Sequence, residues 1–174
     1  MAPQCSVYIA TSLDGFIAEE DGGLAFLESA ESATEDYGYS EFIATVDVIV
    51  MGRGTYEVGL SFPSWCYEGK RVIVLTTGPE RPSVHGEEFS SETPAALVER
   101  LGREGVRRIY VDGGVTIRSF LAAGLIDDLT ISVVPAILGR GIPLFGLGTP
   151  ALALTLESAE SYRTGLVQLR YRRA

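Results

Sequence analysis

The stretch Val48-Ile49-Val50-Met51-Gly52-Arg53-Gly54-Thr55 is the part of the sequence that decides the fold. Its apolar first half predicts a buried strand over residues 46–51. The two glycines that follow allow a tight turn and a close approach of the backbone to a ligand. A short helix near residues 54–60 would then direct its free N–H groups toward an anion. Because Arg53 adds a planar cationic fork that suits a phosphate, the stretch predicts a nucleotide site.

The length and the charge of the chain limit the classes of function that it can serve. Its 174 residues suit a single domain over residues 1–174. A formal net charge of −9 argues against binding of nucleic acid through a broad basic surface. An anionic cofactor is still compatible with this charge, because a local arginine and helix N-termini decide its binding.

The sequence also predicts a cytoplasmic protein that binds neither a membrane nor a metal. It contains two distant cysteines, Cys5 and Cys66, and no CxxC pair, which suits a reducing compartment. We find neither a signal peptide nor an apolar segment long enough to span a membrane. His85 is the only histidine, which argues against a zinc site built on histidine clusters.

Predicted strands and helices alternate along most of the chain, and two strands without a helix follow. Besides residues 46–51, apolar patterns predict strands over 5–11, 71–75, 108–111 and 128–134, an extended piece near 87–90, and late strands over 152–157 and 165–173. Helical patterns cover residues 35–45 and 115–123, and Thr93 with Pro94 marks a further helix start. This order predicts an α/β fold with a mostly parallel sheet and antiparallel C-terminal strands.

Three of the predicted strands end in turns that suit a ligand. Besides the turn at Gly52, these are Leu75-Thr76-Thr77 and Asp112-Gly113-Gly114-Val115-Thr116. In an open parallel sheet, ligands bind beyond the carboxyl ends of the strands. Any one of these turns alone is more often simple turn geometry, but three at one edge favour a nucleotide site. The chain has neither a GxGxxG motif nor a Walker loop, so another α/β type is expected.

Five segments carry a resemblance to a known family, in the same order along the chain: Ser12-Leu13-Asp14-Gly15-Phe16-Ile17-Ala18, Val50-Met51-Gly52-Arg53-Gly54-Thr55-Tyr56, Val74-Leu75-Thr76-Thr77, Val111-Asp112-Gly113-Gly114, and residues 134–145. With them the chain resembles the dihydrofolate reductase superfamily. Within it, the chain is most similar to the branch of the C-terminal reductase domain of the bifunctional riboflavin biosynthesis protein. The resemblance implies a dihydrofolate-reductase-like three-layer fold, NADPH as the cofactor, a small heterocyclic substrate and a homodimer.

The resemblance also implies where the cofactor lies. Arg53 and Thr55 would face the adenosine 2′-phosphate and the diphosphate, on the turn formed by Gly52 and Gly54. The remaining cofactor positions are Leu75, Thr76 and Thr77 at the adenosine end, Gly113, Gly114, Val115 and Thr116 at the diphosphate, and Ala10, Ile17 and Ala18 at the nicotinamide. A cis peptide between Gly113 and Gly114 is implied as well.

The proton donor and the substrate contacts stay open at this point. Asp36 and Glu41, on the predicted helix 35–45, are the candidate proton donors, and each is equally typical of a solvated carboxylate at a helix start. Asp14 either binds a substrate hydroxyl, orders its loop or simply forms an Asp-Gly turn. Arg140 either contacts an anionic substrate or is solvated.

Two classes of function are consistent with these residues. The first is an NADPH-dependent reductase that transfers a hydride to a pterin- or pyrimidine-like substrate. The second is a non-catalytic NADP(H)-binding module or sensor, which the missing clear proton donor supports. Within the first class a phosphorylated substrate is less favoured, because Arg140 and Lys70 are the only obvious additional cations to receive it.

Overall fold

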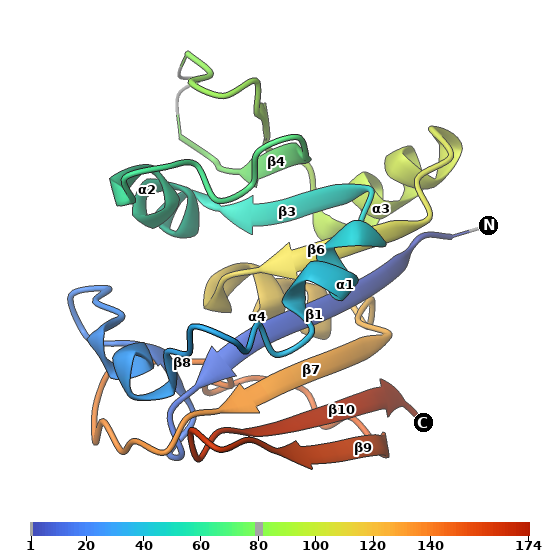
Figure 1. Ribbon diagram of the computed structural model, residues 1–174. Helices are drawn as coiled ribbons and strands as arrows, with labels where there is room; N and C mark the ends of the chain where they lie inside the picture. The colour runs from blue at the N-terminus through green and yellow to red at the C-terminus, as the bar shows by residue number, and fades with distance from the viewer. Residues whose placement is uncertain (1, 79–81) are drawn as a thin grey trace.

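A computed structural model describes residues 2–78 and 82–174, and an eight-stranded sheet forms its centre (Figure 1). The strands of this sheet are β1 (Gln4–Thr11), β3 (Val48–Gly52), β4 (Arg71–Leu75), β5 (Glu88–Ser90), β6 (Arg108–Asp112), β7 (Asp128–Val133), β9 (Leu154–Ser161) and β10 (Val167–Arg173). Their order across the sheet is β5-β4-β3-β6-β1-β7-β10-β9. A second sheet pairs β2 (Phe16–Ala18) with β8 (Ile142–Pro143).

The directions of the strands confirm the predicted α/β sheet. From β5 to β7 every neighbouring pair is parallel. β10 then runs antiparallel to both β7 and β9. β9 begins at Leu154 and continues past its predicted end at residue 157 to Ser161. It lies at the exposed edge of the sheet, where polar residues such as Ser158 and Glu160 carry no apolar signal.

Helices cover both faces of the sheet. They are α1 (Tyr39–Ala44), α2 (Arg53–Ser61), α3 (Pro94–Arg103), α4 (Gly114–Ala122) and the 3-10 helix η1 (Ala25–Ala30). The Thr93 side chain accepts a hydrogen bond from the Ala96 amide and so caps α3, as its sequence predicts. α1 is shorter than the predicted helix, because Gly38 has φ 83° and cannot continue a right-handed helix. No helix among the described residues is long and apolar enough to cross a membrane.

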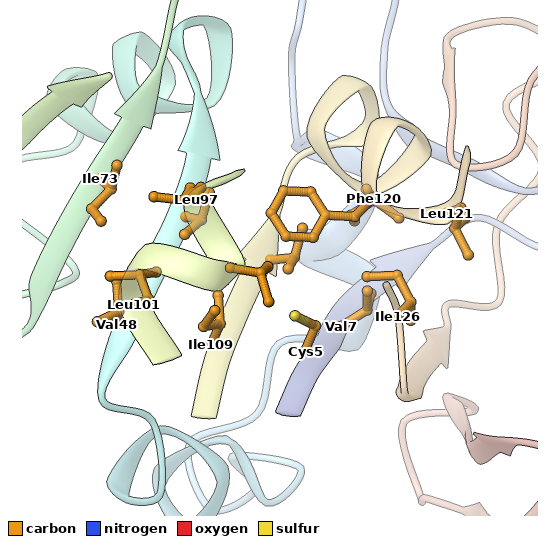
Figure 2. Packing of buried hydrophobic residues seen from close by; sticks show 14 of the residues in the cluster. Cys5, Val7, Val48, Ile73, Leu97, Leu101, Ile109, Phe120, Leu121 and Ile126 are labelled. Carbon is orange, nitrogen blue, oxygen red and sulfur yellow. The ribbon is translucent and has the colours of Figure 1, made fainter. Parts of the chain in front are cut away.

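The run at β3 is buried on both sides, which explains why it is continuously apolar. Val48 and Val50 belong to a cluster with residues of α3 and α4, whereas Ile49 and Met51 face a second cluster. Figure 2 shows the first of these clusters, with Leu97 and Leu101 of α3 and Phe120 of α4 over the strands. The second cluster includes Tyr56 of α2 and is flanked by Tyr39 and Phe42 of α1. The protein therefore has the predicted three layers, with helices on each face of the sheet.

Candidate functional site

A cavity of about 910 Å³ lies at the carboxyl ends of β1, β3 and β6. It brings together most of the predicted cofactor residues, namely Ala10, Ile17, Ala18, Gly52, Arg53, Gly54, Thr55, Leu75, Gly113, Gly114, Val115 and Thr116. Thr76 and Thr77 are not among its lining residues; the Thr76 hydroxyl accepts a hydrogen bond from the Gly78 amide instead. We call this space the first cavity.

Two helices begin at the first cavity without a side-chain cap. α2 has Gly52 at its N-cap and α4 has Gly113, and neither glycine has a side chain that could cap the first amides of its helix. The first intrahelical bond of α4 runs from the Ile117 amide to the Gly113 carbonyl, so the amides before Ile117 have no helical partner. Free amides at two helix starts make a cradle for an anion such as a diphosphate.

Gly113 makes the close approach of the two turns possible. Its φ is 85°, a left-handed region that other residues rarely adopt, and a Cβ at this position would collide with Thr55 Oγ1. On the other side, a Cβ on Gly52 would lie 3.0 Å from Thr116 Oγ1. The predicted cis peptide between Gly113 and Gly114 is wrong for this structure, because every peptide bond in the described residues is trans. The positive φ of Gly113 makes the turn instead.

Arg53 lies between the start of α2 and the loop that follows β4. Its Nε donates to Glu57 Oε1 at 2.9 Å, and its side chain is 38% exposed. A Cβ on Gly78 would lie 3.1 Å from Arg53 Nη1, which places the guanidinium beside the segment of Thr76 and Thr77. The arginine and the two threonines are thus brought to the same end of the site, although only the arginine lines the cavity.

Asp112 lines the first cavity, and nothing in the sequence around it except the turn Asp112-Gly113-Gly114 marks it as a site residue. Its carboxylate accepts hydrogen bonds from the Tyr67 hydroxyl at 2.7 Å and from the Gly113 amide at 2.8 Å. Burial raises the pKa of Asp112 above its ordinary value. Tyr67 also lines the cavity and comes from the loop after α2. Asp112 therefore holds both the glycine turn and this loop in place.

A second cavity of about 710 Å³ adjoins the first and shares Tyr8, Ile9, Ala10 and Leu27 with it. Asp36 lines this second cavity. Its carboxylate accepts hydrogen bonds from the Gly38 amide at 2.9 Å and the Ser40 amide at 3.0 Å. Hydrogen bonding from Ser40, and then from Gly38, lowers the pKa of Asp36 and so further stabilises its ionised form.

The other predicted residues lie outside both cavities. Glu41 is an exposed residue of α1 and lines neither cavity. Asp14 accepts hydrogen bonds from the Ser12 hydroxyl at 2.6 Å and the Gly139 amide at 2.7 Å, and so orders the loop after β7. These bonds lower the pKa of Asp14, that of Ser12 having the larger effect. Arg140 is 80% exposed, with its Nε 3.4 Å from Glu20 Oε2.

A mostly parallel sheet with reversed C-terminal strands and helices on both faces is the fold of the dihydrofolate reductase superfamily. Comparison with known proteins agrees with this superfamily and identifies one family within it. The chain belongs to the RibD C-terminal domain family, whose profile matches residues 3–168. The resemblance stated from the sequence is thereby confirmed.

Individual relatives support this assignment. The uncharacterized protein YwjB of Bacillus subtilis is 38% identical over 170 residues, which cover 97% of each chain. A crystal structure of a putative riboflavin biosynthesis protein from Shewanella sp. PV-4 is 36% identical, with a TM-score of 0.92 over 100% of this chain and 99% of that one. A 2,5-diamino-6-ribosylamino-4(3H)-pyrimidinone 5′-phosphate reductase of Methanothermobacter thermautotrophicus is 30% identical over 102 residues, which cover 55% of this chain and 43% of that protein.

Proposed function

We propose that the protein is an NADPH-dependent reductase that transfers a hydride to a small heterocyclic, pterin- or pyrimidine-like substrate. The family supports a reductase of this kind, and one matching relative carries the name of a pyrimidinone reductase. The observation that carries the proposal is the pair of uncapped helix starts that open into one cavity beside Arg53. Such a cradle fits a dinucleotide with one additional phosphate.

The residues of the first cavity fit NADPH along its whole length. Arg53 would hold the 2′-phosphate at the end near Leu75, Thr76 and Thr77. The amides at the start of α4, with Thr55 and Thr116, would bind the diphosphate, and Gly113 leaves the space that this approach requires. Ala10, Ile17 and Ala18 would border the nicotinamide, at the end where the two cavities meet. When bound, NADPH supplies a hydride from C4 of its nicotinamide ring.

The second cavity provides the place for the substrate. The substrate would have a C=N or C=O bond whose carbon could accept the hydride and whose nitrogen or oxygen could accept a proton, so that the cofactor would leave as NADP⁺. Asp36 is the proposed acidic group at this cavity. As an ionised carboxylate it would orient an amino group of the substrate or a water molecule that delivers the proton. Glu41, Asp14 and Arg140 line neither cavity and would not contact the substrate.

The low pKa of Asp36 favours a second candidate function, an NADP(H)-binding module without turnover. A carboxylate that is held ionised is a weak proton donor. Two measurements separate the candidates. NADPH is titrated against the fluorescence of Trp65, the single tryptophan of the chain, and its absorbance is then followed with a panel of pterins and pyrimidines.

Saturable binding of NADPH together with its steady oxidation is the result expected for the reductase. Binding without oxidation by any member of the panel supports the module instead. If NADPH does not bind, both candidates are wrong. A homodimer and a cytoplasmic location remain predictions, which sedimentation velocity and fractionation of cells test directly.

A further inference from the structure

We propose that the second cavity selects a planar, amino-substituted ring that carries no phosphate group. This inference rests on the proposed function, because it places the substrate beside the nicotinamide end of the first cavity. Beyond that function, it specifies that the second cavity accepts an amino-substituted ring and rejects a phosphate group. Three features of the second cavity lead to it: its aromatic walls, its charge and its floor.

The walls of the second cavity are aromatic. Tyr8 of β1 and the residues Tyr37 and Tyr39 around the start of α1 line it. Tyr8 donates a hydrogen bond to the Tyr37 carbonyl, and its ring lies edge-on to that of Tyr39 with 5.6 Å between the ring centroids. Rings held in this way offer flat apolar surfaces, which suit a planar heterocycle.

The charge of the second cavity is entirely negative. Three exposed carboxylates line it, those of Glu31, Glu35 and Asp36, and none of its lining residues in the described chain is lysine or arginine. Arg170 lies near Tyr8 and Gly38 but is not a lining residue, and its guanidinium donates to Gln168 Oε1 at 3.1 and 3.3 Å. A phosphate dianion would meet like charge at this rim, whereas amino groups would meet acceptors.

The floor of the second cavity carries a buried donor. Ser132 of β7 is 5% exposed and lines the cavity. Its hydroxyl accepts a hydrogen bond from Gln168 Nε2 at 3.1 Å and, among the described residues, donates to no acceptor. Gln168 Nε2 already faces two further acceptors, Tyr8 Oη and the Tyr37 carbonyl, so it offers the ligand no additional hydrogen. The Ser132 hydroxyl is therefore left to donate to a ring nitrogen or carbonyl of the ligand.

A matched pair of ligands tests the exclusion of phosphate. The probes are 2,5-diamino-6-ribosylamino-4(3H)-pyrimidinone and its 5′-phosphate, each titrated by calorimetry into the protein saturated with NADP⁺. We expect the phosphate-free ligand to bind at least tenfold more tightly. In the double variant Glu31→Gln/Glu35→Gln, and for the wild type in 0.5 M salt, the difference in affinity between the two ligands should shrink severalfold. Both changes weaken the repulsion between the phosphate and the carboxylates of the cavity. Glu28→Gln is the control, since Glu28 is an exposed acid on η1 that does not line the cavity.

Two results would overturn the inference while leaving the proposed function intact. One is NADPH binding with equal or tighter binding of the phosphorylated ligand, and the other is NADPH binding with no binding of either ligand. If NADPH itself does not bind, the proposed function and this inference fail together. The separate NADPH titration therefore distinguishes the two failures.

The role of the floor is tested by Ser132→Ala. We expect this variant to bind the phosphate-free ligand about tenfold more weakly, as the loss of one buried hydrogen bond predicts. Its affinity for NADPH should not change. Ser158→Ala, at an exposed position of β9, is the matched control. Wild-type affinity of Ser132→Ala for the phosphate-free ligand would show that the floor does not contact it.

Discussion

At the scale of single residues, Arg53 is the side chain that distinguishes the two forms of the cofactor in our proposal. It is anchored by Glu57 and lies beside the loop after β4, where a 2′-phosphate would extend from the adenosine. A planar guanidinium can donate to Glu57 and to a phosphate at the same time, because its donors point in different directions.

We expect Arg53→Ala to weaken NADPH binding by about 1.5–3 kcal/mol, the range of a lost hydrogen bond to a charged group. The affinity for NADH should change little, because NADH lacks the 2′-phosphate. Fluorescence titration with both nucleotides measures the difference, and Arg140→Ala serves as the control, since Arg140 lines neither cavity. An equal loss for the two nucleotides would contradict the assignment of Arg53 to the 2′-phosphate.

Gly113 occupies a backbone position that has no room for a side chain. In Gly113→Ala the new Cβ would collide with Thr55 Oγ1 at a positive φ, so we expect a loss of about 1–3 kcal/mol in the free energy of unfolding together with weaker NADPH binding. Gly54→Ala is the control for stability, because a Cβ there has no atom within 4 Å and φ is not positive. Urea unfolding measures both variants. Equal stability of the two would show that the turn at Gly113 tolerates a side chain.

At the scale of elements, the loop before β5 depends on one buried carboxylate. Glu87 is 6% exposed and accepts hydrogen bonds from the Tyr56 hydroxyl and from the Val84 and His85 amides. Burial opposes ionisation of this group, but the hydrogen bonds outweigh it and lower the pKa of Glu87 to about 2. The carboxylate thereby ties this loop to α2.

A pH dependence of stability follows from the lowered pKa of Glu87. The pKa is about 4.5 for a free glutamate and about 2 in the folded protein, so the stabilisation is complete above pH 4.5 and is lost as the pH falls toward 2. Its size is of the order of 3 kcal/mol by linkage. The difference in unfolding free energy between wild type and Glu87→Gln, measured by urea unfolding from pH 7 to pH 2.5, should shrink across this window. A constant difference would contradict the assignment.

At the scale of the whole molecule, one sheet joins the N-terminal and the C-terminal halves of the chain. β1 lies between β6 and β7, and β10 follows β7, so early and late segments alternate across the sheet. We therefore propose that residues 1–174 fold as a single cooperative unit. The fluorescence of Trp65 and the far-UV circular dichroism should give coincident urea transitions. Two separate transitions would indicate independent folding units.

Much of the fold could be predicted from the sequence because its signals are local. The apolar run at β3, the cap at Thr93 and the glycines after β3 and β6 each act within a few residues, and all of them are confirmed as strand, helix start or turn. The start of α1 was less predictable. The apolar spacing of Tyr39, Phe42 and Ile43 predicts a helix, but the left-handed conformation of Gly38 prevents this helix from starting earlier in the chain. The packing of the apolar residues favours a helix at this place, whereas the conformation of Gly38 opposes one.

The sequence by itself determined the order of the strands of the main sheet and of its α-helices, and the edge of the sheet at which ligand-binding turns gather. The small sheet of β2 and β8 and the 3-10 helix η1 were not predicted. Only the tertiary structure decided that Tyr67 donates to Asp112, that Gly113 turns through a trans peptide, and that the second cavity joins carboxylates to the buried Ser132. The physical reason is the range of the interactions. The apolar period of an element and the chemistry of a turn depend on neighbouring residues. The charge and shape of a cavity depend on loops that are distant in the sequence and have no apolar period.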